Sequence, residues 1–293
     1  MKVIHYASLS VGLLLILAAA APAVPVIALS TRDQLVSFDS STPGTLSSAV
    51  FISGLSANES LVGIDYRPAT GELYGLGSQA RLYKLNATTG AATFVAGLTT
   101  AGGSPLALNG VEFGVDFNPV PDRMRVTSNL GQNLRIDVTT GITTVDLSLN
   151  GVGTHVVSSA YTNSFAGATS TTLYNIESQL DLLTIQNPPN NGTQVSVGAL
   201  GLDVTALAGF DILTVGSTNT AYAALQPAGS QGSRFYTIDL TTGAATLVGA
   251  IGANQSSDSL AIRDITVTPV PEPTVMVSLG LGAMALLRRR RRS

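Results

Sequence analysis

The chain has 293 residues, of which 45% are hydrophobic and 11% are charged, and its formal net charge is −3. It contains no Cys and only two His, which excludes a disulfide scaffold, a Cys-ligated zinc or iron–sulfur site and a His-rich metal site. A coiled coil or helix bundle is excluded as well, because 30 Gly lie in a background of Ser, Thr and Asn rather than in apolar heptads.

Residues 1–23 have the features of a secretory signal peptide. Lys2 gives a positive start, an apolar stretch covers 11–20, and Ala21-Pro22-Ala23 supplies the small residues of a cleavage site. We therefore predict export and cleavage at this point. Cleavage after Ala28, or a buried N-terminal helix in place of a signal, are the alternatives.

The middle of the chain repeats a turn with the pattern Asn/Asp-x-Thr-Thr-Gly. The turn glycines, including two from looser copies, are Gly44, Gly90, Gly141, Gly192 and Gly243, spaced by 46 residues and then three times by 51. Apolar and polar residues alternate before each turn, and Gly adopts a positive φ at little cost. Each copy is therefore predicted to form a β-hairpin, and the period is typical of a propeller or another repeat array.

A second pair of strands is predicted between successive hairpins, at 61–67 and 73–76, 111–118 and 124–128, 158–162 and 173–177, and 207–213 and 221–225. Four strands in about 50 residues make up one propeller blade. The N-terminal copy lacks its first strand, and 259–266 resembles 60–67. We predict an all-β fold for 24–269, a β-propeller of five four-stranded blades closed by the C-terminal strand. An open β-solenoid or a sandwich is the alternative.

The C-terminal segment, residues 270–293, has three parts. The residues Pro271, Glu272 and Pro273 precede 14 uncharged residues, and a basic run follows, made of Arg288, Arg289, Arg290, Arg291 and Arg292. A helix of 14 residues spans about 21 Å, and arginine side chains can extend its reach into a membrane. We predict a transmembrane helix with the arginines in the cytoplasm. A plain membrane anchor and a basic nucleic-acid-binding tail are the alternatives.

This arrangement resembles the PEP-CTERM sorting signal of Gram-negative bacteria. The resemblance implies a partner, an exosortase-like membrane transpeptidase that removes the tail near the Pro-Glu-Pro motif, and an association with exopolysaccharide and biofilms. Removal of both ends would leave nine basic and 17 acidic residues, a net charge near −8. Such a charge disfavours binding to nucleic acid or to an anionic membrane surface.

The body of the chain also resembles the DUF4394 family of uncharacterised bacterial repeat proteins. The stretches that carry this resemblance are 114–119, 122–125, 131–135, 160–163 and 186–192. The resemblance implies a propeller-like fold that often carries a sorting signal. It implies no activity.

Four aspartates occupy similar places on the predicted first strands of the blades: Asp65, Asp116, Asp211 and Asp264. One blade has Ala160 instead. If these strands line the channel, the carboxylates could bind a hard cation such as calcium or act as a catalytic pair in a glycosidase. The alternative is a repeated structural role, in which each Asp caps a turn or bonds to a backbone group between blades.

A second group of polar residues departs from the repeat: Asp122, Arg123, Arg125 and Arg135. It could bind a polar polymer such as a glycan, or it could form an Arg–Asp network that stabilises a blade interface. His155 is the one histidine after the leader, and the chain has no nucleophile elbow, P-loop or zinc-protease motif. We therefore expect neither enzyme activity nor a cofactor.

Together these features predict a non-enzymatic protein with a structural, adhesive or binding role. It would cross the inner membrane of a Gram-negative bacterium, be anchored transiently by its tail, and end at the cell surface or in the extracellular matrix. Exopolysaccharide is the candidate partner. A secreted carbohydrate-active hydrolase and a calcium-dependent binding module are the alternatives.

Overall fold

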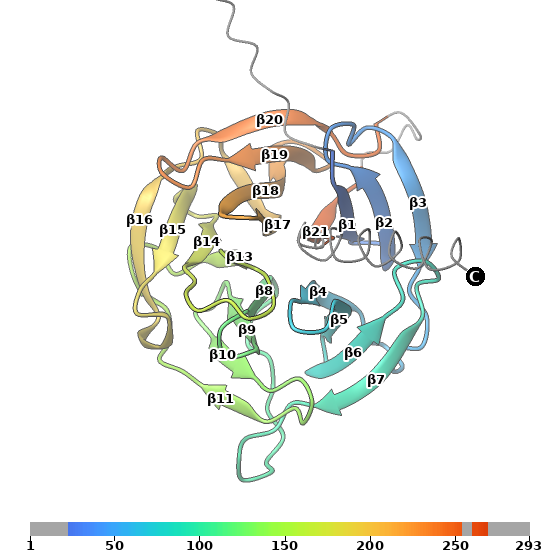
Figure 1. Cartoon of the computed structure of the whole chain (residues 1–293), viewed down its shortest axis with the longest axis vertical. Helices are drawn as coiled ribbons and strands as arrows, with labels where there is room; N and C mark the ends of the chain where they lie inside the picture. Colours follow the sequence, from blue (N-terminus) through green and yellow to red (C-terminus); the bar gives the residue numbers. More distant parts are fainter. Residues whose placement is uncertain (1–22, 254–259, 269–293) are drawn as a thin grey trace, which may run out of the picture.

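The computed structural model describes residues 23–253 and 260–268, which form five sheets arranged as blades around a central axis (Figure 1). No helix in these two stretches is long and apolar enough to cross a membrane. The predicted signal peptide, the Pro-Glu-Pro motif, the transmembrane helix and the arginine run lie at 1–22 and 269–293, outside the described residues.

Each blade is an antiparallel sheet of four main strands. Blade 1 contains β1 (Pro25–Ser30), β2 (Gln34–Asp39), β3 (Leu46–Phe51) and β21 (Ile262–Val267). Blade 2 contains β4 (Leu61–Arg67), β5 (Glu72–Gly77), β6 (Arg81–Leu85) and β7 (Ala92–Gly97). Blade 3 contains β8 (Phe113–Asn118), β9 (Arg123–Ser128), β10 (Asn133–Ile136) and β11 (Thr143–Val145).

Blade 4 contains β13 (Val156–Tyr161), β14 (Leu173–Glu177), β15 (Leu182–Gln186) and β16 (Thr193–Ala199), with the 3-10 turn η1 (Pro189–Asn191) between the last two strands. It also has a fifth strand, β12 (Asn150–Gly151), which pairs in parallel with β16. Blade 5 contains β17 (Val204–Val215), β18 (Thr218–Pro227), β19 (Arg234–Ile238) and β20 (Ala245–Ala250). The prediction of five blades is therefore confirmed, with one short strand more than expected.

The ring closes through β21, as the sequence predicts. This strand pairs with β1 in antiparallel register, with Val26 opposite Val267, so that the first blade combines the two ends of the described chain. Closure in this way removes the exposed inner edge that β1 would otherwise present.

The repeated turns owe their shape to the predicted residues. The side-chain oxygens of Asn86, Asp137 and Asp239 each accept a hydrogen bond from the backbone two residues later, at N···O distances of 2.9, 2.9 and 2.7 Å. The glycine that ends each of these turns has a positive φ. Such local bonds favour a turn over continued strand.

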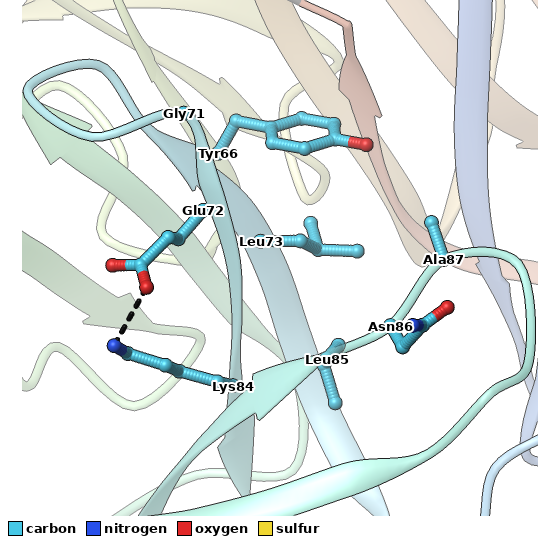
Figure 2. Close-up of a pocket in the computed structure, with 8 residues that line it drawn as sticks. All are labelled: Tyr66, Gly71, Glu72, Leu73, Lys84, Leu85, Asn86 and Ala87. Atoms are coloured by element: carbon cyan, nitrogen blue, oxygen red, sulfur yellow. Dashed lines mark hydrogen bonds and ion pairs between the residues drawn. The ribbon is translucent and has the colours of Figure 1, made fainter.

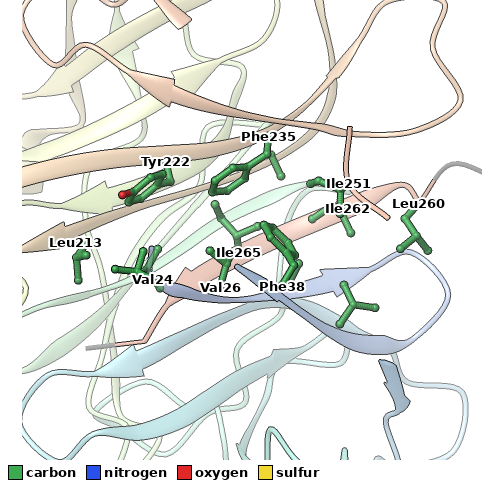
Figure 3. Packing of buried hydrophobic residues seen from close by; sticks show 14 residues of the cluster. Val24, Val26, Phe38, Leu213, Tyr222, Phe235, Ile251, Leu260, Ile262 and Ile265 are labelled. Carbon is green, nitrogen blue, oxygen red and sulfur yellow. The ribbon is translucent and has the colours of Figure 1, made fainter. Parts of the chain in front are cut away.

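Apolar cores fill the spaces where the faces of neighbouring blades meet. At the seam between blades 5 and 1, the ring of Phe235 contacts Phe38 edge-on at 5.1 Å and stacks on Tyr222 at 5.5 Å (Figure 3). Val26 and Ile262 from the closing pair of strands are fully buried in the same core. Burial of apolar surface is the main stabilising term here, and it acts across the closure.

The innermost strands β4, β8, β13, β17 and β21 surround the axis (Figure 1). The end of β21 at Val267 and the start of β1 lie side by side, because Thr268 N–H donates to the carbonyl of Pro25 at 3.0 Å. We call the face of the ring at which β21 ends the exit face. Both described ends of the chain therefore lie on the exit face.

Candidate functional site

The four predicted aspartates, here called the axial aspartates, all lie on innermost strands and are buried. The carboxylate of each accepts a hydrogen bond from a backbone N–H of the next blade: Asp65 from Phe117 at 2.8 Å, Asp116 from Tyr161 at 3.2 Å, Asp211 from Val267 at 2.6 Å and Asp264 from Ile64 at 2.9 Å. Each one therefore joins two blades next to the axis.

The seam between blades 4 and 5 uses other groups. Blade 4 has Ala160 where the other blades have Asp. There the backbone N–H groups of Asn163 and Ser164 donate to the side chains of Asn219 at 2.9 Å and Thr214 at 3.0 Å. The side-chain-to-backbone link is thus kept at this seam, and the carboxylate is not needed for it.

Three of the axial aspartates converge as well as joining blades. One oxygen from each of Asp65, Asp116 and Asp211 lies within 4.8 Å of the other two. Burial raises the pKa of Asp65 well above its usual value, and the negative charge of Asp211 raises it further. Burial likewise raises the pKa of Asp116, with added repulsion from Asp65 and Asp211. A buried group of this kind keeps a proton or gathers around a cation.

The space beside these carboxylates is small. A cavity of about 10 Å³ is lined by Asp65, Asp211 and residues at the exit-face ends of the inner strands, among them Tyr66 and Val267. This is room for about one water molecule or ion, whereas sites for organic ligands measure about 300–1,000 Å³. Three carboxylate oxygens could supply part of the six to eight oxygen ligands that calcium takes.

The second predicted group divides into separate contacts. Asp122 pairs with Arg67, and Arg123 pairs with Asp137 at 3.2 Å. Arg135 pairs with Asp146 at 2.7 Å. The residues that lie close together in sequence therefore do not form one open ligand site.

Arg125 is the centre of a buried network between blades 3 and 4. Its guanidinium, with 1% of the side chain exposed, donates to Asp146 at 2.7 Å, Asn133 at 2.7 Å, Asn190 at 2.8 Å and Tyr161 at 3.2 Å. Burial raises the pKa of Asp146, but hydrogen bonds from Arg135 and Arg125 outweigh it, so the pKa of this carboxyl lies below its usual value. This arrangement has the form of the stabilising network that was the alternative to a ligand site.

A pocket of about 320 Å³ opens on blade 2 (Figure 2). It is lined by Tyr66, Gly71, Glu72, Leu73, Lys84, Leu85, Asn86 and Ala87. Lys84 pairs with Glu72 at 2.7 Å on one side, and the Tyr66 ring covers another. Burial raises the pKa of Tyr66, and the nearby side chain of Thr268, the last described residue, lowers it. The pocket therefore lies beside the point where the C-terminal segment begins.

Sequence reasoning missed this pocket, because its residues come from two separate turns that only the folded blade brings together. One signal was available: Lys84 is the only Lys besides Lys2 in the leader. It also missed Asp146 and Asn190, whose roles depend on the packing of blade 4 against blade 3.

Three solved structures show similarity to the chain at 11–13% identity. For hydrazine synthase of Kuenenia stuttgartiensis the TM-score is 0.39, and the match covers 64% of this chain and 47% of that one, so the chain spans about half of that protein's length. For a nidogen/laminin complex the TM-score is 0.45, with 84% and 98% covered. For a protein of unknown function from Bacteroides thetaiotaomicron it is 0.46, with 86% and 68% covered.

A search of curated proteins gave no match. A family model described as a domain of unknown function, DUF4394, matches residues 34–261, and a model of the PEP-CTERM protein-sorting motif matches residues 269–292. The second match indicates export and sorting to the bacterial cell surface by an exosortase-like enzyme. Since the first match covers most of the chain, the protein belongs to the DUF4394 family and ends in a PEP-CTERM sorting motif.

Proposed function

We propose that this protein is a non-enzymatic component of the cell surface or extracellular matrix of a Gram-negative bacterium. Its tail holds it at the inner membrane until an exosortase-like enzyme cuts near Pro271-Glu272-Pro273. The released propeller then has a structural or adhesive role, with exopolysaccharide as its candidate partner. The observation that carries this proposal is the sorting motif at 269–292, which follows the strand that closes the ring.

The position of the exit supports this order of events. The motif begins one residue after Thr268, so it leaves the ring on the exit face. While the tail is in the membrane, the exit face is turned toward the membrane and toward the sorting enzyme. The opposite face and the circumference are then free to meet partners outside the cell.

The intact mass of the protein, measured in membrane and extracellular fractions of the producing cells, tests this proposal. We expect an extracellular form that ends near Pro271–Pro273, with or without an added group, and a longer form in the membrane. A variant with Pro271→Ala and Glu272→Ala should accumulate in the membrane. A control with Asp239→Asn, an exposed turn residue far from the motif in sequence, should be processed normally.

A wild-type mass that keeps Arg288–Arg292 in the membrane, with no shorter form outside, would contradict the proposal. The tail would then be a permanent anchor. Release into the matrix would have to be abandoned.

A secreted hydrolase that uses the axial aspartates is the competing function. Glycosidases hold their two carboxyl groups about 5–10 Å apart, on either side of a bound sugar. Asp65 and Asp116 are both buried, and the cavity beside Asp65 measures only about 10 Å³, which favours the structural role. Hydrolysis of a broad polysaccharide panel distinguishes the two: turnover by the wild type that is lost in both Asp65→Asn and Asp116→Asn would support the hydrolase.

A further inference from the structure

The circumference of the ring consists of five strand edges. The outermost strands β3, β7, β11, β16 and β20, here called the rim, turn one edge outward (Figure 1). The short strand β12 covers Asn150–Gly151 and pairs with only the first two residues of β16. Apart from this pairing and bonds near the start of each rim strand, the outward backbone groups of the rim form no backbone hydrogen bonds within the described residues.

The rim carries no charge. The five stretches that contain the rim strands, 40–58, 86–111, 138–145, 182–202 and 240–257, have no Asp, Glu, Lys or Arg. Natural proteins protect exposed strand edges with charged residues, most often Lys, because an edge without charge is free to pair with another strand. This protection is missing from all five rim strands.

Each rim strand also exposes a large apolar side chain. The exposed fractions are 70% for Phe51, 56% for Phe94, 59% for Val145, 50% for Val195 and 52% for Leu247. Single exposed apolar residues are common on proteins. Here every rim strand has an exposed apolar residue, with Thr or Ser in the same strand. This is the composition of a strand that pairs with a neighbour on both edges.

One protective device is present. The register of β3, β7, β16 and β20 shifts by one residue against the neighbouring strand. Such bulges twist an edge and limit the length of any added ladder. A partner strand can therefore pair with only a few residues of each edge.

We propose that the rim is a homotypic docking surface, at which a second copy of this chain pairs its own rim strand with an exposed edge. A second copy is the occupant that offers the same kind of uncharged strand edge, and the charge distribution leaves the rim as the place where two copies can meet. The described residues outside the rim include 16 acidic and nine basic residues, so two copies repel each other there. Two uncharged edges meet without this repulsion, and the backbone donors and acceptors of one edge match those of the other.

The five edges give each molecule several places for such contacts. A contact of a few backbone hydrogen bonds buries far less than the roughly 1,200–2,000 Å² of a stable interface, so each one is weak. Several contacts per molecule strengthen the assembly by avidity, as at the high local concentration of a matrix. This inference deepens the proposed structural role, and it rests on that proposal for placing the protein in the extracellular matrix.

Sedimentation of the full-length chain in a mild detergent, which covers the apolar tail, tests the inference at concentrations up to about 1 mM. The rim variant carries Phe51→Lys, Val195→Lys and Leu247→Lys. The control carries Val111→Lys, Leu130→Lys and Leu180→Lys, whose side chains are 68%, 62% and 53% exposed but lie outside the strands. The two variants have equal charge and an equal loss of exposed apolar residues.

We expect the wild type and the control to associate as concentration rises, and the rim variant to associate at least about tenfold more weakly. Unchanged thermal melting shows that a variant is folded, and Phe51→Lys alone provides a milder version if the triple variant is not. A monomeric wild type, an associating rim variant, or equal loss in the control would each overturn the inference. None of these results depends on tail processing, so failure here leaves the sorting proposal standing.

Discussion

Gly141 lies directly against the carbonyl group of Gly97 in the preceding blade. A Cβ atom at position 141 would lie 2.2 Å from that carbonyl oxygen, which is far inside van der Waals contact. The same junction is bonded on both sides: Thr99 N–H donates to Gly141 at 3.0 Å, and Thr143 N–H donates to Thr99 at 2.7 Å. The Thr-Thr-Gly turn is therefore also the place where one outer strand is joined to the next.

This contact recurs around the ring. A Cβ at Gly90, Gly192 or Gly243 would lie 2.2, 2.4 or 2.5 Å from a carbonyl oxygen of the preceding blade. At the remaining seam, Gly252 N–H donates to the carbonyl of Pro43 at 2.9 Å. The repeat of about 50 residues thus preserves a docking point between blades as well as a hairpin.

Substitution of Gly141 by Ala should destabilise the protein by about 3 kcal/mol. The φ of Gly141 is +76°, which costs an Ala about 1 kcal/mol or more, and the approach to the Gly97 carbonyl adds the cost of displacing backbone. Gly71→Ala is the matched control, because its φ is +68° and nothing lies within 4 Å of the added Cβ. Urea unfolding measures both variants, and equal losses would show that the blade contact contributes little.

Arg125→Met should cost about 3–5 kcal/mol of unfolding free energy. It removes one partner of a buried ion pair and leaves Asp146, 5% exposed, with Arg135 alone. Arg123→Met is the control: its pair with Asp137 is 41% and 28% exposed, and such pairs contribute about 0–1 kcal/mol. Should the two variants unfold at the same urea concentration, the network around Arg125 would not be structural, and a ligand role would return to consideration.

The blade architecture could be predicted because its determinants are local and repeated. Alternating residues and Asn/Asp-x-Thr-Thr-Gly turns mark each hairpin, and the likeness of 259–266 to 60–67 identified the closing strand. The fifth strand of blade 4, Asn150–Gly151, could not be predicted. Its two residues have no strand pattern of their own and pair only because β16 lies beside them.

The candidate sites were harder to predict from the sequence than the blades were. Repetition placed the axial aspartates on equivalent strands, but the 4.8 Å convergence of three of them depends on closure of the ring. For Arg123 and Arg125, closeness in sequence was misleading. The two side chains share one face of β9 because they are two residues apart, but Arg123 begins the strand and pairs with Asp137 in a turn, whereas Arg125 lies further along it and reaches Asn190 in the next blade.

Asp65→Ala and Asp65→Asn should differ clearly in stability. The Asp65 carboxylate accepts from Phe117 N–H at 2.8 Å and from the Thr266 hydroxyl at 2.9 Å. Ala leaves two buried donors without an acceptor, at about 1–3 kcal/mol each, whereas Asn keeps one acceptor oxygen and removes a charge. We expect a loss of about 3 kcal/mol for Ala and about 1 kcal/mol or less for Asn in thermal or urea unfolding. Similar losses would mean that these bonds do not hold the blades together.

The stability of the protein should be greatest near pH 4 and decline toward neutral pH. Burial raises the pKa of Asp65, Asp116 and Asp264 well above the usual value of an aspartate, and raises that of Asp211 as well. The folded state therefore binds protons more tightly than the unfolded state, so stability is lost as pH rises through the raised values. On the acid side, the lowered pKa of Asp146 means that its contribution is lost as pH falls below 3.8.

Urea unfolding from pH 3 to 8 measures the free energy of unfolding as a function of pH. In Asp116→Asn the decline toward neutral pH should be less steep, because one of the converging carboxylates no longer titrates. Asp203→Asn, which removes a carboxylate outside the axial group, is the control. A wild type that gains stability steadily from pH 4 to 8 would contradict the prediction.

If added Ca²⁺ raises the melting temperature of chelator-treated wild type but not of Asp116→Asn, the converging oxygens are cation ligands, because a bound cation replaces the proton in balancing their charge.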